Sequence, residues 1–256
     1  MLLAVDVGNT NIVLGLFDGD KLLHFWRLHT DPQITTDELT LQINSLLRMA
    51  GFSFEAVQGM VVASVVPPLV HPLTRFAERH LKLNPLIVGP GTKTGMPILI
   101  DNPKELGADL IVNAVAAKEK FGAPVIVVDF GTATTFSAVS LKGEYLGGVI
   151  APGVKMALDG LFFQTAKLPR VEIVEPASAI GKSTVTAMQS GIFFGFVGLA
   201  REIIHQLKQE MGVNCPVVAT GGLSGMFARR IPEVDFLEPH LTLEGLRLIF
   251  ERNQKK

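Results

Sequence analysis

The chain has 256 residues, 48% of them hydrophobic, which is enough to bury a large core and argues against disorder. Its formal net charge of -1 gives no basic surface for nucleic acid or anionic membrane, and its single cysteine, Cys215, excludes an internal disulfide and a thiolate metal cluster. The first apolar stretch meets Asp6 too early for a signal peptide, and the apolar stretch 191–200 has only about half the roughly 20 residues of a membrane span. We therefore expect a cytoplasmic protein with no nucleic-acid or membrane partner.

Apolar alternation and helical periodicity predict strands and helices in an order typical of an α/β protein. Strands are expected at 2–7, 11–17, 21–28, 60–65, 124–129, 134–140, 144–149 and 216–219. Helices are expected at 36–50, 70–82, 103–121, 185–210 and 243–252. Because hairpins followed by helices occur twice, the pattern favours an α/β fold over a sandwich or a helical bundle.

One segment of the sequence is repeated. "LLAVDVGNTNIVLGLF" at 2–17 can be laid over "PVIVVDFGTATTFSAVS" at 124–140. This alignment matches Asp6 with Asp129, and it matches the glycine that stands two residues after each of them. Two copies of one strand–turn–strand unit indicate two similar α/β halves.

The spacing of the two copies suggests where the halves meet. We predict an N-terminal half at 1–115 and a C-terminal half at 116–256, with the seam within 116–123. A cleft is expected between the halves, because ligand sites commonly lie between domains.

The turn after the first strand, Gly8-Asn9-Thr10, is suited to binding an anion. It offers closely spaced backbone N–H groups, and glycine lets a phosphate approach without interference from a Cβ atom. Asp6, beside this turn, can hold a Mg²⁺ ion through water, and the ion can bridge to phosphate oxygens. An ordinary hairpin with a capping aspartate explains one copy equally well. The second copy, at Asp129, favours a phosphate clamp.

A short apolar strand ends in Thr220-Gly221-Gly222. Paired glycines remove side chains, so that a flat adenine or ribose can lie against the backbone. A plain strand-to-helix turn accounts for the same residues nearly as well.

The stretch Asn102-Pro103-x-Glu105 has the residues of a helix start, with Asn as N-cap, Pro at the first helical position and Glu at the third. Asp109 would then lie in the second turn, where its carboxylate could accept a proton from an attacking hydroxyl. Spacing alone favours another interpretation. Glu105, Asp109 and Asn113 recur every four residues and could form one solvated stripe.

In chain order, the motifs "DVGNTN", "NPKELGADLIVNAVAA", "DFGTATT", "GGVIAPG", "TVTAMQSG" and "ATGG" resemble those of the type III pantothenate kinases, in the actin-like and sugar-kinase ATPase superfamily. The resemblance covers nearly the full chain. It implies two actin-like (ribonuclease H-like) α/β halves. It also implies ATP-dependent phosphorylation of pantothenate to 4'-phosphopantothenate, the first step of coenzyme A biosynthesis, by a homodimer with pantothenate at the subunit interface.

The resemblance further implies roles for the residues that match the motifs. Asp109 is the expected general base. The residues expected to bind ATP are Asp6, Val7, Gly8, Asn9, Thr10, Asn11, Ile12, Val13, Thr132, Gly221 and Gly222. Those expected to bind the substrate are Gly107, Ala108, Asp109, Leu110 and Thr184. The expected cofactors are Mg²⁺ with ATP, held by Asp6 through water, and K⁺ or NH₄⁺, held by Asp129.

Two positions depart from the family pattern. Leu110 stands where the family usually has arginine, and Ile100 where it often has tyrosine. Leucine cannot supply the charged planar donor of a guanidinium. Two alternatives therefore stay open: a kinase for another small hydroxylated substrate, or a nucleotide-binding regulator without turnover. The intact Asp6, Asp109 and Asp129 argue against the second.

The string "GKST" at 181–184 resembles the end of a Walker motif but lacks the preceding spacing, so it is not a P-loop. Thr184 matches a substrate contact of the family. A plain N-cap role explains Thr184 equally well.

Overall fold

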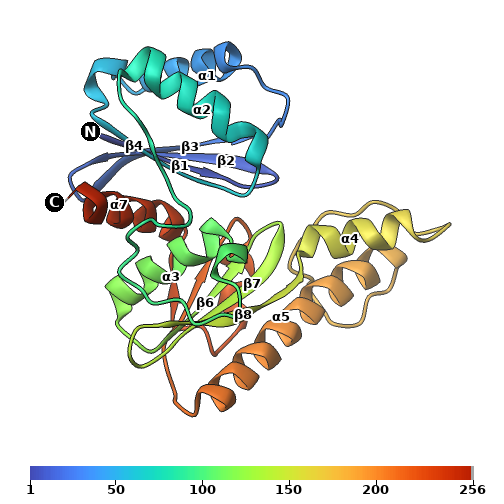
Figure 1. Ribbon diagram of the computed structural model, residues 1–256. Coiled ribbons are helices and arrows are strands. Elements are labelled where there is room, and N and C mark those ends of the chain that lie inside the picture. The colour runs from blue at the N-terminus through green and yellow to red at the C-terminus, as the bar shows by residue number, and fades with distance from the viewer. Residues whose placement is uncertain (255–256) are drawn as a thin grey trace. The chain divides into compact units, whose positions relative to one another are not determined.

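The computed structural model describes residues 1–254 and contains two compact units (Figure 1). Unit 1 comprises Met1–Met96, Asp101–Ala116 and the chain from Leu241 onward, and unit 2 comprises Pro97–Ile100 and Ala117–His240. The last helix belongs to unit 1, and the short segment Pro97–Ile100 belongs to unit 2. The chain therefore crosses between the units several times, whereas a division into 1–115 and 116–256 has a single crossing.

Unit 1 is built on a five-stranded sheet in the order β3-β2-β1-β4-β5. Its strands are β1 (Leu2–Val7), β2 (Asn11–Asp18), β3 (Lys21–His29), β4 (Gly59–Ser64) and β5 (Leu86–Ile87). Its helices are α1 (Thr36–Met49), α2 (Val70–Phe76), the first part of α3 (Ala108–Phe121) and α7 (Leu241–Gln254). Short 3₁₀ turns lie at Phe54–Ala56, Pro67–Leu69 and Pro103–Glu105, and a π-helical turn at Ala77–Leu81.

The two faces of this sheet are covered by different helices. In β1 the odd-numbered side chains Leu3, Val5 and Val7 join a core with residues of α1 and α2. Because side chains alternate along a strand, Leu2, Ala4 and Asp6 point to the opposite face. Figure 1 shows α7 on the side of the sheet away from α1 and α2, and α7 contacts β1, β2 and β4. Asp6 therefore lies on the α7 face.

Unit 2 contains a second five-stranded sheet, in the order β10-β9-β6-β7-β8. Its strands are β6 (Val125–Phe130), β7 (Ala133–Val139), β8 (Tyr145–Pro152), β9 (Val217–Thr220) and β10 (Phe236–Leu237). Its helices are the second part of α3, then α4 (Val154–Phe163), α5 (Thr184–Met211) and α6 (Ser224–Phe227), followed by a 3₁₀ turn at Ala228–Arg230.

The two sheets have the same topology. Read from the outer hairpin strand, β3-β2-β1-β4-β5 corresponds to β8-β7-β6-β9-β10. In each, the first strand pairs antiparallel with the next strand and parallel with the strand that follows the hairpin. β1 and β6 also share one sequence of buried and half-buried positions, with the aspartate next to last. The prediction of two similar α/β halves is confirmed.

Some elements differ from the predicted ones. The expected helix at 103–121 starts with an isolated 3₁₀ turn, and α3 begins only at Ala108, because Leu106 has an extended backbone (φ -67°, ψ 122°). The expected helix at 70–82 is α-helical only to Phe76. β5 and β10 have two residues each, too few to show alternation, and neither α4 nor α6 was predicted.

Among the described residues, α5 is the one helix whose length and composition would allow it to cross a membrane. The apolar stretch 191–200 lies within this helix of 28 residues and understates its length. Phe193, Phe196 and Ile204 are buried in the core of unit 2, as in the central helix of a globular domain.

Candidate active site

The first predicted phosphate turn is held firmly within unit 1. β1 ends one residue after Asp6, and the Gly8 N–H donates to the carbonyl of Asn11 at 3.0 Å across the turn. Thr30 is buried, directly follows β3 and holds the turn through two hydrogen bonds. Its N–H donates to the carbonyl of Thr10 at 3.0 Å, and its Oγ1 donates to the carbonyl of Gly8 at 2.7 Å. Hydrogen bonds from Gly8 and Thr30 therefore hold the turn in one conformation.

The second turn, in unit 2, repeats this geometry with one residue fewer. Asp129 is next to last in β6, and the Gly131 N–H donates to the carbonyl of Ala133 at 3.1 Å. Gly153, the N-cap of α4, packs so closely on this turn that a Cβ atom there would overlap the carbonyl oxygen of Thr132. Thr132 itself is exposed.

Gly221 lies against the same carboxylate. Thr220, at the end of β9, pairs with Asp129 of β6, and the next residue turns with φ +94°. A Cβ atom on Gly221 would overlap Asp129 Oδ1 and would lie 2.7 Å from both the N and the C atoms of Phe130. Unit 2 therefore brings together three of its predicted site residues: Asp129, Thr132 and Gly221. Gly222 follows directly and is exposed.

The start of α3 differs from the prediction. Asn102 is an N-cap, but of the 3₁₀ turn: its Oδ1 accepts from the Lys104 N–H at 3.3 Å. Because α3 begins at Ala108, Asp109 lies in its first turn and not in its second. A Cβ atom on Gly107 would lie 2.5 Å from Asp109 Oδ1. Glycine at 107 therefore leaves the space that the Asp109 carboxylate occupies.

The interpretation of Asp109 as part of a solvated stripe is wrong. Glu105 is exposed, but Asn113 is only 1% exposed, and Asp109 and Leu110 are half-buried. Burial raises the pKa of the Asp109 carboxyl above its ordinary value, although hydrogen bonds from the backbone N–H groups of Leu110 and Asp109 act in the opposite direction. A carboxylate in this environment is a stronger base than a solvated one.

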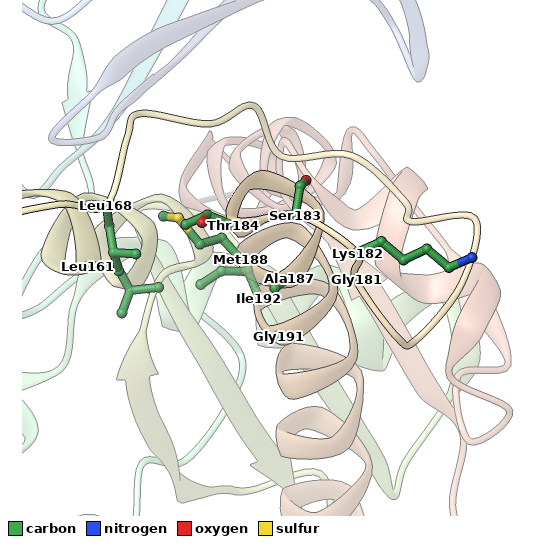
Figure 2. Close-up of a pocket in the computed structure, with 10 residues that line it drawn as sticks. All are labelled: Leu161, Leu168, Gly181, Lys182, Ser183, Thr184, Ala187, Met188, Gly191 and Ile192. Carbon is green, nitrogen blue, oxygen red and sulfur yellow. The ribbon is translucent and has the colours of Figure 1, made fainter.

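Thr184 lines an open pocket of about 860 Å³ formed by α4, the segment at 164–183 and the start of α5. Figure 2 shows its side chain near Met188, while Lys182 extends away from it. The N-cap of α5 is Ser183, whose Oγ accepts from the Thr186 N–H at 3.2 Å. The interpretation of Thr184 as an N-cap is therefore wrong, and its exposed hydroxyl is not committed to that role.

Thr184 and the turn at Thr132 are associated with opposite ends of α4. Gly153, at the start of α4, touches the Thr132 carbonyl, whereas Leu161, near the end of α4, lines the Thr184 pocket. Leu161 follows Gly153 by eight positions in the chain, a rise of about 12 Å along α4.

Comparison with known proteins identifies the family. Residues 2–206 match the sequence profile of the type III pantothenate kinase family. The type III pantothenate kinase of Moorella thermoacetica is 54% identical over 99% of this chain and 100% of its own length, and that of Geobacter sulfurreducens is 50% identical over the whole of both chains. This chain belongs to the type III pantothenate kinase family. Among solved structures, the activator of the 2-hydroxyisocaproyl-CoA dehydratase from Clostridium difficile has the same fold, with a TM-score of 0.57 at 13% identity over 99% of this chain and 96% of its own.

In this member of the pantothenate kinase family, several residues that hold the candidate site in place could not be recognised from the sequence alone. Thr30 and α7 carry no local signal that links them to the predicted phosphate turns. Gly153 is the last residue of the "GGVIAPG" motif, but the motif alone does not indicate what this glycine contacts. Ile100, one of the two departures from the family pattern, lies in unit 2, where its Cγ2 would contact a Cβ atom on Gly147 at 3.8 Å.

The number of carboxylates near one another indicates which kind of metal complex the candidate site fits. Residues 1–254 contain no group of three or more His, Cys, Asp or Glu side chains that could hold a metal ion. A single carboxylate such as Asp6 suits a divalent ion that arrives with the nucleotide, because Mg²⁺ keeps most of its waters and takes its other ligands from phosphate. The residues therefore fit a metal–nucleotide complex better than a bare ion.

Proposed function

We infer that this chain catalyses the ATP-dependent phosphorylation of pantothenate to 4'-phosphopantothenate, the first step of coenzyme A biosynthesis. The observation that carries this inference is the repeated strand–carboxylate–glycine turn, present once in each unit of a chain from this family. In phosphoryl transfer a protein mainly positions its reactants and neutralises charge, and backbone N–H groups in fixed turns serve both purposes.

The nucleotide side of the proposal follows from these turns. Residues 6–13 and Thr132 bind the phosphates, and Gly221 and Gly222 flank the adenosine. A divalent metal accompanies ATP, and we take it to be Mg²⁺ held by Asp6 through water. Asp129 holds K⁺ or NH₄⁺. The position of its carboxylate beside the Gly131 turn and Gly221 supports this role, since carboxylate oxygens are ligands that hard cations take.

In this proposal, the residues at the start of α3 bind pantothenate and supply the base. The Asp109 carboxylate takes the proton from the primary hydroxyl of pantothenate as the hydroxyl oxygen attacks the γ-phosphorus. The bond from that phosphorus to the β,γ-bridging oxygen breaks, and ADP leaves. Gly107, Ala108 and Leu110 bind pantothenate beside the base, and the raised pKa of Asp109 supports its role as proton acceptor.

Thr184 supports a homodimer. Its pocket is lined by Leu161, about 12 Å along α4 from Gly153, which touches the Thr132 turn of the same unit, so a substrate contact by Thr184 is easier to supply to a second copy of the chain. Exposed apolar side chains on α4 and α5, among them Met156, Phe163 and Phe194, offer an apolar surface for such a contact. We place this homodimer in the cytoplasm.

Asp109→Asn tests the mechanism. Asparagine is nearly isosteric, so nucleotide affinity should be kept while turnover with pantothenate falls by roughly 10²- to 10⁴-fold, the usual effect of losing a general base. Glu105→Gln is the matched control, because it removes an exposed carboxylate from the preceding turn. Nucleotide titration and steady-state turnover on both variants check the expectation. Near-normal turnover of Asp109→Asn with normal nucleotide affinity would falsify Asp109 as the base.

A further inference from the structure

α7 fits into unit 1 through side chains that occupy the space above glycines. A Cβ atom on Gly15 of β2 would lie 2.9 Å from Cδ1 of Leu243, and a Cβ atom on Gly59 of β4 would overlap the ring of Phe250. These two contacts, seven positions apart in α7, hold the helix on the sheet face that carries Asp6. The position of α7 along the sheet is therefore closely determined, because packed interiors tolerate little displacement.

The same helix also contacts α3. Gly245 packs on α3 so closely that a Cβ atom there would overlap the carbonyl oxygen of Val112. One turn earlier, Thr242 Oγ1 donates to Oδ1 of Asn113 at 2.7 Å. Asn113 is 1% exposed, so the loss of a hydrogen bond there is not readily made good by water.

Asp109 lies close along α3 to the residues that α7 contacts. It lies in the first turn of α3, four residues or about 6 Å of helix before Asn113. The residues before α3 do not continue its axis, since Leu106 is extended. Within unit 1, Thr242 and Gly245 therefore hold the part of α3 that carries the carboxylate.

We propose that Thr242 is a positioning residue for the base: by holding Asn113 it sets the position of Asp109 relative to the sheet that bears Asp6. This proposal rests on the function proposed above and assigns part of that site to the C-terminal helix. The match to the type III pantothenate kinase family covers residues 2–206 and does not include α7. The plain alternative is a core hydrogen bond that contributes to stability alone.

Thr242→Val removes the donor and keeps the shape of the side chain. A displacement of about 1 Å can cost about 10²-fold in rate, so we expect kcat for pantothenate to fall roughly 10-fold while the Kd for a non-hydrolysable ATP analogue stays within about twofold. Thr242→Ser, which keeps the hydroxyl, should restore kcat to within about threefold of the wild type. Thr40→Val is the matched control: Thr40 is a half-buried threonine of α1 whose Oγ1 donates to the carbonyl of Thr36 at 2.7 Å. It should leave kcat unchanged.

A double-mutant cycle with Asp109→Asn separates positioning from stability. If Thr242 acts through Asp109, then adding Thr242→Val to Asp109→Asn should lower kcat by less than about twofold. The reason is that Asp109→Asn already lacks the base whose position Thr242 would set. All rates are compared below the onset of melting of every variant, so that a loss of folded protein does not enter kcat. A full 10-fold loss in the Asp109→Asn background, or normal kcat in Thr242→Val alone, overturns the proposal. An Asp109→Asn enzyme with wild-type turnover overturns the base itself, so the two failures are distinguishable.

Discussion

Gly221→Ala examines the contact that holds Asp129 in unit 2. Gly221 has φ +94°, in the left-handed region that side chains rarely adopt. The added methyl group would overlap Asp129 Oδ1 and would lie 2.7 Å from the backbone N and C atoms of Phe130. The backbone of β6 cannot move aside easily, because β6 pairs with β7 on one side and with β9 on the other. The substitution should therefore strain the turn and displace the carboxylate.

The expected cost has two parts. A non-glycine residue in the left-handed region costs about 1–2 kcal/mol. Forcing a methyl group into a packed site costs a further 1–3 kcal/mol or so. Together they predict a loss of about 2–5 kcal/mol in the free energy of unfolding, or roughly 4–20 °C in melting temperature for a chain of this size.

Two other glycines separate these parts. Gly212 has φ +64° with no atom within 4 Å of a Cβ position, so Gly212→Ala should show the backbone cost alone. Gly225, in α6, has open space as well and no positive φ, so Gly225→Ala should cost nothing. Urea unfolding of the three variants measures the difference. If Gly221→Ala costs no more than Gly212→Ala, the Asp129 carboxylate does not occupy the space beside Gly221, and the reasoning is refuted.

Three further expectations concern the cation, the base and the subunits. Turnover should require K⁺ or NH₄⁺, and Asp129→Asn should remove this dependence together with most of the rate; equal rates of the wild type in sodium and potassium buffers would count against the cation site. Because folding raises the pKa of Asp109, the stability that its protonated form contributes is lost as the pH rises through the folded pKa. Asp109→Asn should therefore melt above the wild type at neutral pH, with the difference vanishing in acid, and a variant that melts lower at neutral pH would contradict the pKa direction. Sedimentation should show a dimer at micromolar concentration, and Met156→Glu, at a side chain 54% exposed on α4, should weaken it; a fully active wild-type monomer would exclude the interface.

The parts of the fold that could be predicted are those with local causes. β1 and β6 were recognisable because each carries a run of buried positions that ends in an aspartate and a glycine turn. That pattern depends only on burial and on the conformational freedom of glycine, both of which act within a few residues. The repeated sheet order follows from the repeated pattern, so the fold class could be inferred as well.

The start of α3 shows where local signals are insufficient. Asn102 and Pro103 are sound capping residues, and the structure uses them as such, but the turn they open stops at Glu105. Whether a first turn continues into a helix depends on what the following residues pack against, because a nucleus of one turn is unfavourable by itself. Here the chain becomes extended at Leu106 and starts α3 with Ala108, and the expected place of Asp109 was wrong by one turn.

α7 was predicted as a helix, yet nothing in its sequence tells which unit it joins. Its place is decided by complementary shapes from opposite ends of the chain: Leu243 above Gly15, and Phe250 above Gly59. A glycine in a strand and a large side chain in a distant helix carry no mutual signal in a single sequence, because each is ordinary in its own element. The two predicted phosphate turns are therefore encoded locally, whereas the position of the proposed base depends on the packing of the C-terminal helix. Substitutions in α7 should accordingly alter catalysis without altering any residue that touches a reactant.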